Sequence, residues 1–169
     1  MKYRDEEDKC YGVTGMAIGL TIFEADDLFN SITIDAEGLD CISFTPEYYF
    51  TGNPAISARN AWKSVLEHYQ LTSGLVIADA MCRRMFRDRG SMDKALRKSL
   101  YEAIAEEGKN SCQLEDDEVE QIFEKSYRYL MKLLSNYQVQ DIVQDFAKEL
   151  KRRRIMTQHE VAEELRLLR

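Results

Sequence analysis

The sequence predicts an all-α protein: a single-domain bundle of about six or seven helices around a central helix, with an irregular or weakly extended segment near 35–53. Three observations favour this class. Residues 55–169 contain no proline, a residue that costs roughly 3 kcal/mol in a helix interior. Apolar residues recur at helical spacing along that run. Capping residues and glycines stand where helices of ordinary length would begin and end.

The first part of the chain carries the weakest helical signals. Residues 1–10 are mostly charged and are predicted to be frayed. A helix is predicted over residues 11–34, because their apolar side chains share one face. Three glycines inside this segment weaken that prediction. The rival interpretation is a short hairpin, in which residues 32–34 and 39–44 pair around a turn that contains a glycine.

End signals divide the middle of the chain into three predicted helices. The first two lie before Gly90 and are separated by a break at residues 72–74. Gly90 stands where a left-handed residue ends a helix. Ser91 is predicted to cap the third helix, and Gly108 is predicted to end it.

The last third of the chain carries three more predicted helices. The longest, residues 116–136, opens with an acidic cluster that the helix dipole favours and is expected to be the central helix. The next one, residues 139–150, ends in the cations of residues 151–154. Thr157 and Glu160 form a capping-box pattern that opens the terminal helix.

Acidic and basic residues are unevenly distributed along the chain. The net charge is −7, and the first 50 residues carry 3 basic and 11 acidic side chains, whereas residues 51–114 carry 10 basic and 7 acidic ones. The acidic first part is therefore expected to complement the basic middle, within one molecule or between subunits. The overall charge argues against nonspecific nucleic-acid binding by the chain as a whole.

Composition and length indicate one domain over residues 1–169 in a reducing compartment. A chain of 169 residues with 44% hydrophobic residues buries enough surface to fold without a metal or a disulfide, so no cofactor is expected. The four cysteines have no paired spacing. The charged start is unlike a signal peptide, and the longest apolar-rich run, residues 13–23, is too short to cross a bilayer. We expect a cytoplasmic protein without a membrane anchor.

A basic stretch over residues 83–98 is the first candidate site. On a helix, Arg83 and Arg87 lie one turn apart, and Arg84 lies on a neighbouring face. Forked guanidinium donors of this kind bind phosphates or carboxylates, whereas the alternative is a solvated face. The candidate anion or partner-binding residues are Arg83, Arg84, Arg87, Arg89 and Arg97.

An aromatic loop is the second candidate site. Tyr48, Tyr49 and Phe50 are consecutive in the loop of residues 45–54, which Pro46 and Pro54 bracket. Three successive aromatic side chains of an extended segment cannot all point inward. The loop therefore either covers the core or presents an exposed anchor for a partner.

Catalytic and metal-binding patterns are absent from the sequence. The two histidines, His68 and His159, fit neither the Glu-x-x-His pattern of di-iron bundles nor a His-Glu-x-x-His zinc helix. No set of residues forms a recognisable nucleophilic triad. We therefore predict no catalytic residues and no metal ligands.

Two segments carry a resemblance to a known group of proteins. Residues 11–17, Tyr-Gly-Val-Thr-Gly-Met-Ala, and residues 49–62, which begin Tyr-Phe-Thr-Gly-Asn-Pro, resemble an uncharacterised family from anaerobic bacteria. The resemblance implies a bacterial protein of unassigned function and transfers no catalytic residues.

The sequence leaves three functions open. The first is a non-catalytic helical interaction or adaptor protein that binds a protein partner or self-associates through an apolar face or the aromatic loop. The second is a nucleic-acid-associated or regulatory protein that uses the arginine stretch. The third is an enzyme with a dispersed site.

Overall fold

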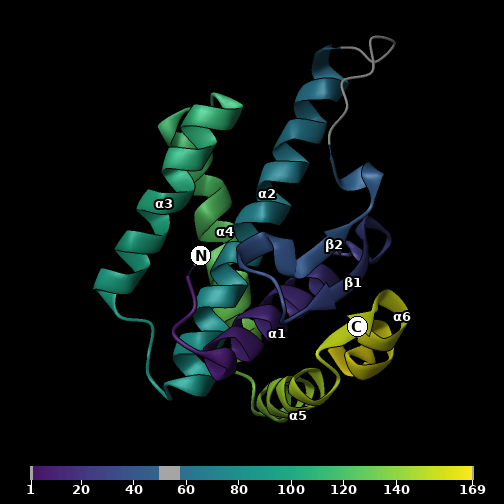
Figure 1. Cartoon of the computed structure of the whole chain (residues 1–169). Helices are drawn as coiled ribbons and strands as arrows, with labels where there is room; N and C mark the ends of the chain where they lie inside the picture. The colour runs from purple at the N-terminus through teal and green to yellow at the C-terminus, as the bar shows by residue number, and fades with distance from the viewer. Residues whose placement is uncertain (1, 50–57, 169) are drawn as a thin grey trace.

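The computed structural model describes residues 2–49 and 58–168 (Figure 1). Helices dominate this part of the chain, which confirms the predicted all-α class, and one small sheet accompanies them. The helices are α1 (Glu6–Ile22), α2 (Ala58–Cys82), α3 (Lys94–Cys112), α4 (Asp116–Leu134), α5 (Tyr137–Arg153) and α6 (Gln158–Glu164). The strands are β1 (Phe29–Thr33), β2 (Ile42–Phe44) and β3 (Ile155–Thr157).

The central helix is α1. All of residues 12–21 are buried, and α1 packs against α2, α5 and β1. The prediction that residues 116–136 form the central helix is wrong, because α4 is amphipathic and buries one face only. A helix that is buried on all sides needs no polar face, so its sequence lacks the strong periodicity that marks a surface helix.

Glycines allow α1 to approach α2 closely. A methyl group at Gly15 would lie 2.2 Å from the carbonyl oxygen of Ala78 on α2, and one at Gly19 would lie 2.9 Å from the Leu75 side chain. These distances are shorter than a side chain tolerates. The glycines that weakened the helix prediction therefore allow α1 to pack closely against α2.

The helix predicted to about residue 34 ends earlier, and the rival hairpin forms. α1 ends at Ile22, and β1 pairs antiparallel with β2, with Ile32 opposite Ile42. On its other edge β1 pairs with β3, where Ile32 faces Met156. The sheet order is β2-β1-β3. No sequence signal predicted β3, because three residues carry too little periodicity.

Several helices begin or end at residues other than those predicted. The break at residues 72–74 is absent, because Gly74 lies inside α2 and accommodates the Phe23 ring. Asp93 rather than Ser91 caps α3, accepting a hydrogen bond from the Leu96 N–H at 2.8 Å. α3 continues past Gly108 and ends at the left-handed Gln113.

Two other end signals are confirmed. The capping box of Thr157 and Glu160 opens α6. The acidic cluster opens α4 with a second capping box, formed by Glu115 and Glu118. None of the helices in the described residues is long and apolar enough to cross a membrane.

Candidate functional site

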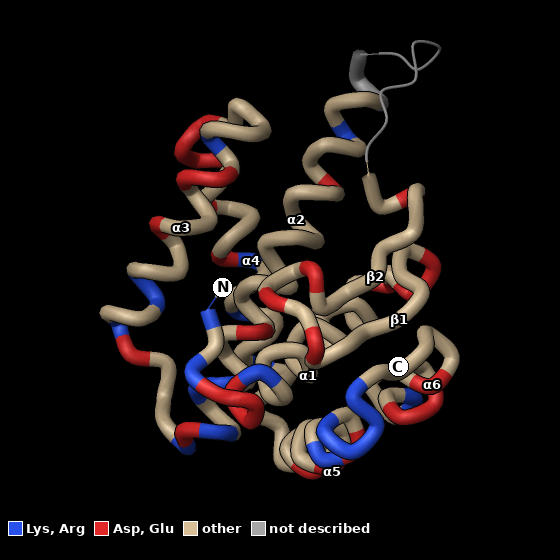
Figure 2. Tube along the Cα trace, in the orientation of Figure 1, with Lys and Arg blue, Asp and Glu red and all other residues tan. Residues whose placement is uncertain are grey.

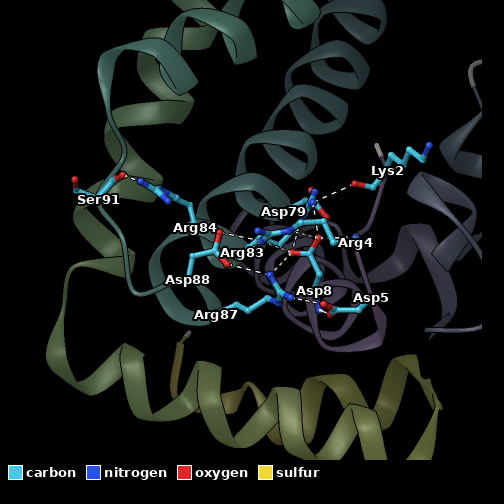
Figure 3. A network of polar contacts seen from close by, with 10 residues as sticks. All are labelled: Lys2, Arg4, Asp5, Asp8, Asp79, Arg83, Arg84, Arg87, Asp88 and Ser91. Carbon is cyan, nitrogen blue, oxygen red and sulfur yellow. Dashed lines mark hydrogen bonds and ion pairs between the residues drawn. The ribbon is translucent and has the colours of Figure 1, made fainter.

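A buried aspartate organises the basic residues at the end of α2 (Figure 3). Asp8, in the first turns of α1, is fully buried. It accepts hydrogen bonds from Arg83 Nε at 2.9 Å and Arg83 Nη2 at 2.7 Å, and from Arg4 Nη2 at 3.1 Å. Burial alone would raise the pKa of Asp8, but the hydrogen bonds from Arg83 and Arg4 hold it well below its usual range.

A second buried carboxylate, that of Asp79, lies beside the same guanidinium. Arg83 Nη1 donates to Asp79 Oδ2 at 3.2 Å. The Arg83 guanidinium also lies over the Tyr3 ring, 5.0 Å from its centroid. The Tyr3 hydroxyl faces Asp79, and burial together with this carboxylate raises the pKa of Tyr3. Neither that hydroxyl nor Asp79 Oδ1 has a hydrogen bond of good geometry to the part of the chain that the structure describes, and burial raises the pKa of Asp79.

Arg83, Arg84 and Arg87 lie on a π-helical turn, Arg83–Arg87, that continues α2. This turn directs Arg87 towards Asp5, which caps α1, and Arg87 Nη1 also pairs with Asp88 at 3.0 Å. Arg4 pairs with Asp88 at 2.8 Å. Charges of both signs therefore lie intermixed around the start of α1 (Figure 2).

This network has two consequences for the sequence predictions. The acidic first part of the chain does complement the basic middle, within one molecule. Residues 6–10, predicted to belong to a frayed leader, form the first turns of α1. A charged segment becomes ordered here because each of its key carboxylates meets an arginine that is distant in sequence.

The five candidate arginines do not converge on one anion cradle. Arg84 donates to the Ser91 carbonyl oxygen at 3.0 Å, and Arg89 is exposed. Arg97, on α3, pairs with Glu124 and lies over the Tyr127 ring. An incoming anion would have to displace protein carboxylates from Arg83 and Arg87. Anion binding by these residues stays a prediction.

The aromatic residues divide between core and surface. Tyr48 is buried: its ring stacks on Phe44 with centroids 3.5 Å apart, and its hydroxyl hydrogen-bonds Thr72 at 2.9 Å. Tyr49 is 58% exposed. Phe50 lies outside the described residues. Tyr48 thus covers the core, and a partner contact at this loop stays a prediction.

A concave surface with apolar walls, which sequence reasoning missed, forms a groove between α2 and α3. Its volume is about 670 Å³. One face of α2 forms the first wall, one face of α3 forms the second, and Leu39 and Asp40 border the groove. The apolar residues of the two walls are Val76, Ala80, Leu96, Leu100, Ala103 and Ile104.

One polar contact connects α2 directly to α3 at the α2–α3 groove, and another joins the segments that follow α2 and precede α3. At one end, the Tyr69 hydroxyl donates to the Ile104 carbonyl oxygen at 2.8 Å. A methyl group at Gly108 would lie 2.5 Å from this hydroxyl, so the glycine predicted to end a helix makes room for Tyr69 instead. On the π-helical turn after α2, Arg84 donates a hydrogen bond to the carbonyl oxygen of Ser91, which precedes α3, and lies 3.7 Å from Asp93.

Small side chains leave the middle of the α2–α3 groove open. The facing positions of α2 and α3 include Ser73, Ala80, Ser99 and Ala103, which are too short to fill the space between two helices. Larger residues at these positions would close the groove by ordinary core packing. The spacing of small residues on both helices was the available sequence signal.

Comparisons with protein-family models, with curated proteins and with solved structures found no match. The resemblance to the bacterial family therefore stays a prediction. Among the described residues, no group of three or more histidine, cysteine or acidic side chains is placed to hold a metal ion.

Proposed function

We propose that this protein is a non-catalytic helical interaction protein that binds an apolar segment of a partner in the α2–α3 groove. The observation that carries the proposal is a hollow of about 670 Å³ with apolar walls on two helices. Filling it would bury apolar side chains that now contact water, at roughly 25 cal/mol per Å² of apolar surface. Partner helices commonly bind grooves of this kind.

The charged contacts favour this function over binding of nucleic acid. Arg83 and Arg87, central to the basic stretch, form ion pairs with Asp8 and Asp5. Arginines that are neutralised within the protein contribute little to the release of counterions from a phosphate backbone. Binding of an apolar segment in the α2–α3 groove does not require these ion pairs to break.

A neutral solvatochromic dye, Nile red, tests whether the groove accepts an apolar occupant. Ala103→Arg, at an exposed position of the α3 wall, is expected to weaken dye binding about fivefold or more, because it places a charge among apolar groups. Asn110→Arg is the matched control, since Asn110 is exposed on α3 and lies outside the groove. Equal dye binding by both variants and the unmodified chain would contradict the proposal.

A further inference from the structure

We infer that the occupant of the α2–α3 groove is a basic amphipathic helix of a partner protein, about four turns long. This inference rests on the proposed function and specifies the chemistry of the partner. Three features of the groove support it: the carboxylates that border it, the ion pairs that the cations beside it form within the protein, and its length.

Two exposed carboxylates, those of Asp40 and Glu107, border the α2–α3 groove. Asp40 lies on the segment between β1 and β2, and Glu107 lies on α3, where other acidic residues also gather (Figure 2). Both are exposed, and neither forms an ion pair with any residue in the described ranges 2–49 and 58–168; Glu107 accepts one hydrogen bond, from the Ser111 hydroxyl at 2.8 Å. They are therefore available to lysine or arginine side chains of an occupant.

The cations beside the α2–α3 groove are already neutralised. Arg83, which lines it, bonds Asp8 and Asp79. An adjoining hollow of about 430 Å³ carries Arg4 and Arg84 together with their carboxylate partners, Asp88 and Asp93. An occupant therefore meets negative charge, because the two exposed charged residues that line the groove, Asp40 and Glu107, are both carboxylates.

The length and the wall pattern of the groove fit a helix. The α2 wall runs from Tyr69 to Arg83, which is about 21 Å at 1.5 Å per residue. Four helical turns have this length. The small residues of both walls leave room for leucine-sized side chains at i, i+3, i+4 and i+7 of an occupying helix.

Two synthetic peptides of equal length test the inference on the full chain. Both carry leucines at i, i+3, i+4 and i+7 and a fluorescein label; one has lysines at the flanking positions and the other has glutamates. Fluorescence anisotropy in low salt is expected to show about tenfold tighter binding of the lysine peptide, because only its charges complement the groove. Ala103→Arg is expected to abolish binding of both peptides.

A double variant isolates the carboxylates. Asp40→Asn with Glu107→Gln is expected to weaken binding of the lysine peptide about fivefold, as for two exposed ion pairs, and to affect binding of the glutamate peptide much less. The matched control is Glu106→Gln with Asp117→Asn, since both residues are exposed and lie outside the groove. Equal binding of the two peptides, or an equal effect of both double variants, would overturn the inference while Nile red binding still supports the proposed function.

Other occupants give different results. Sedimentation that shows a dimer of the chain, lost in Ala103→Arg, would identify a second copy as the occupant and overturn the inference. Displacement of the lysine peptide by dodecylamine at a lower concentration than by an unlabelled lysine peptide would identify a small cationic amphiphile instead. Failure of both Nile red and the peptides to bind would reject the proposed function itself.

Discussion

At the scale of single residues, glycines and one buried aspartate have roles that the sequence could not reveal. Gly15 and Gly19 sit against α2, and Asp8 binds Arg83, which is 75 positions away. Helix propensity counts glycine as unfavourable, and composition counts aspartate as exposed. Both expectations fail here because these glycines and Asp8 contact residues that are distant in the sequence.

Gly15→Ala is expected to destabilise the protein by about 1–3 kcal/mol, the usual cost of overpacking. The added methyl group meets the Ala78 backbone at 2.2 Å, and a backbone carbonyl cannot turn away. Gly90→Ala is the matched control, because its methyl group meets the flexible end of Arg84. Urea denaturation measures both changes, and equal stability of the two variants would contradict this account.

Asp8→Asn is expected to cost about 3 kcal/mol at pH 7, since it removes the buried carboxylate that accepts two hydrogen bonds from Arg83. The folded-state pKa of Asp8 is lowered, so its contribution is present above the unfolded carboxyl pKa, about 3.9, and is lost as the pH falls through the folded value. The stability difference between wild type and variant should therefore narrow below about pH 4.

Urea denaturation at pH 7 and pH 3 measures that difference. Asp117→Asn, at an exposed position in the first turn of α4, should change stability by less than about 1 kcal/mol at pH 7, the contribution of a carboxylate near a helix N-terminus. A difference for Asp8→Asn that does not change with pH would refute the ionic role of Asp8.

At the scale of elements, α3 depends on its connection to α2 as well as on its own caps. Tyr69 contacts the backbone of α3 at Ile104 and fits beside Gly108. In the sequence alone, Gly108 is typical of a helix end, and Tyr69 is typical of a core residue. The tertiary contact instead explains why α3 continues to Cys112.

Tyr69→Phe is expected to cost about 1 kcal/mol, the net value of one hydrogen bond, while the ring stays packed. Hydrogen exchange of backbone amides near residues 100–108 should become faster, because α3 loses its connection to α2 at this end. Tyr101→Phe is the control: its ring packs on Phe123, and its hydroxyl has no hydrogen bond to the described residues. Similar exchange in both variants would argue against the Tyr69 contact as a support of α3.

At the scale of the whole molecule, α1 joins parts of the chain that are far apart in sequence. It contacts α2, α5, β1 and the π-helical turn, and β1 pairs with both β2 and β3. The core is one continuous cluster of buried residues. We therefore expect the helices and the sheet to unfold together.

Urea unfolding should give one transition with the same midpoint by two probes, as for a cooperative domain. Far-ultraviolet circular dichroism reports all helices, and the fluorescence of Trp62, the single tryptophan of the chain, reports α2. The Gly15→Ala variant should move both midpoints equally. Separate midpoints would show that α2 and the remaining helices are independent units.

The sequence by itself determined the all-α class, the acidic start of α4 and the capping box of α6, because proline content, periodicity and caps are local properties. The central position of α1, the hairpin with its third strand and the pairing of Asp8 with Arg83 were decided only by the tertiary structure. The α2–α3 groove belongs to this second group. Each of these features depends on residues that are distant in the chain, and a local pattern is the same whether or not a partner element lies beside it.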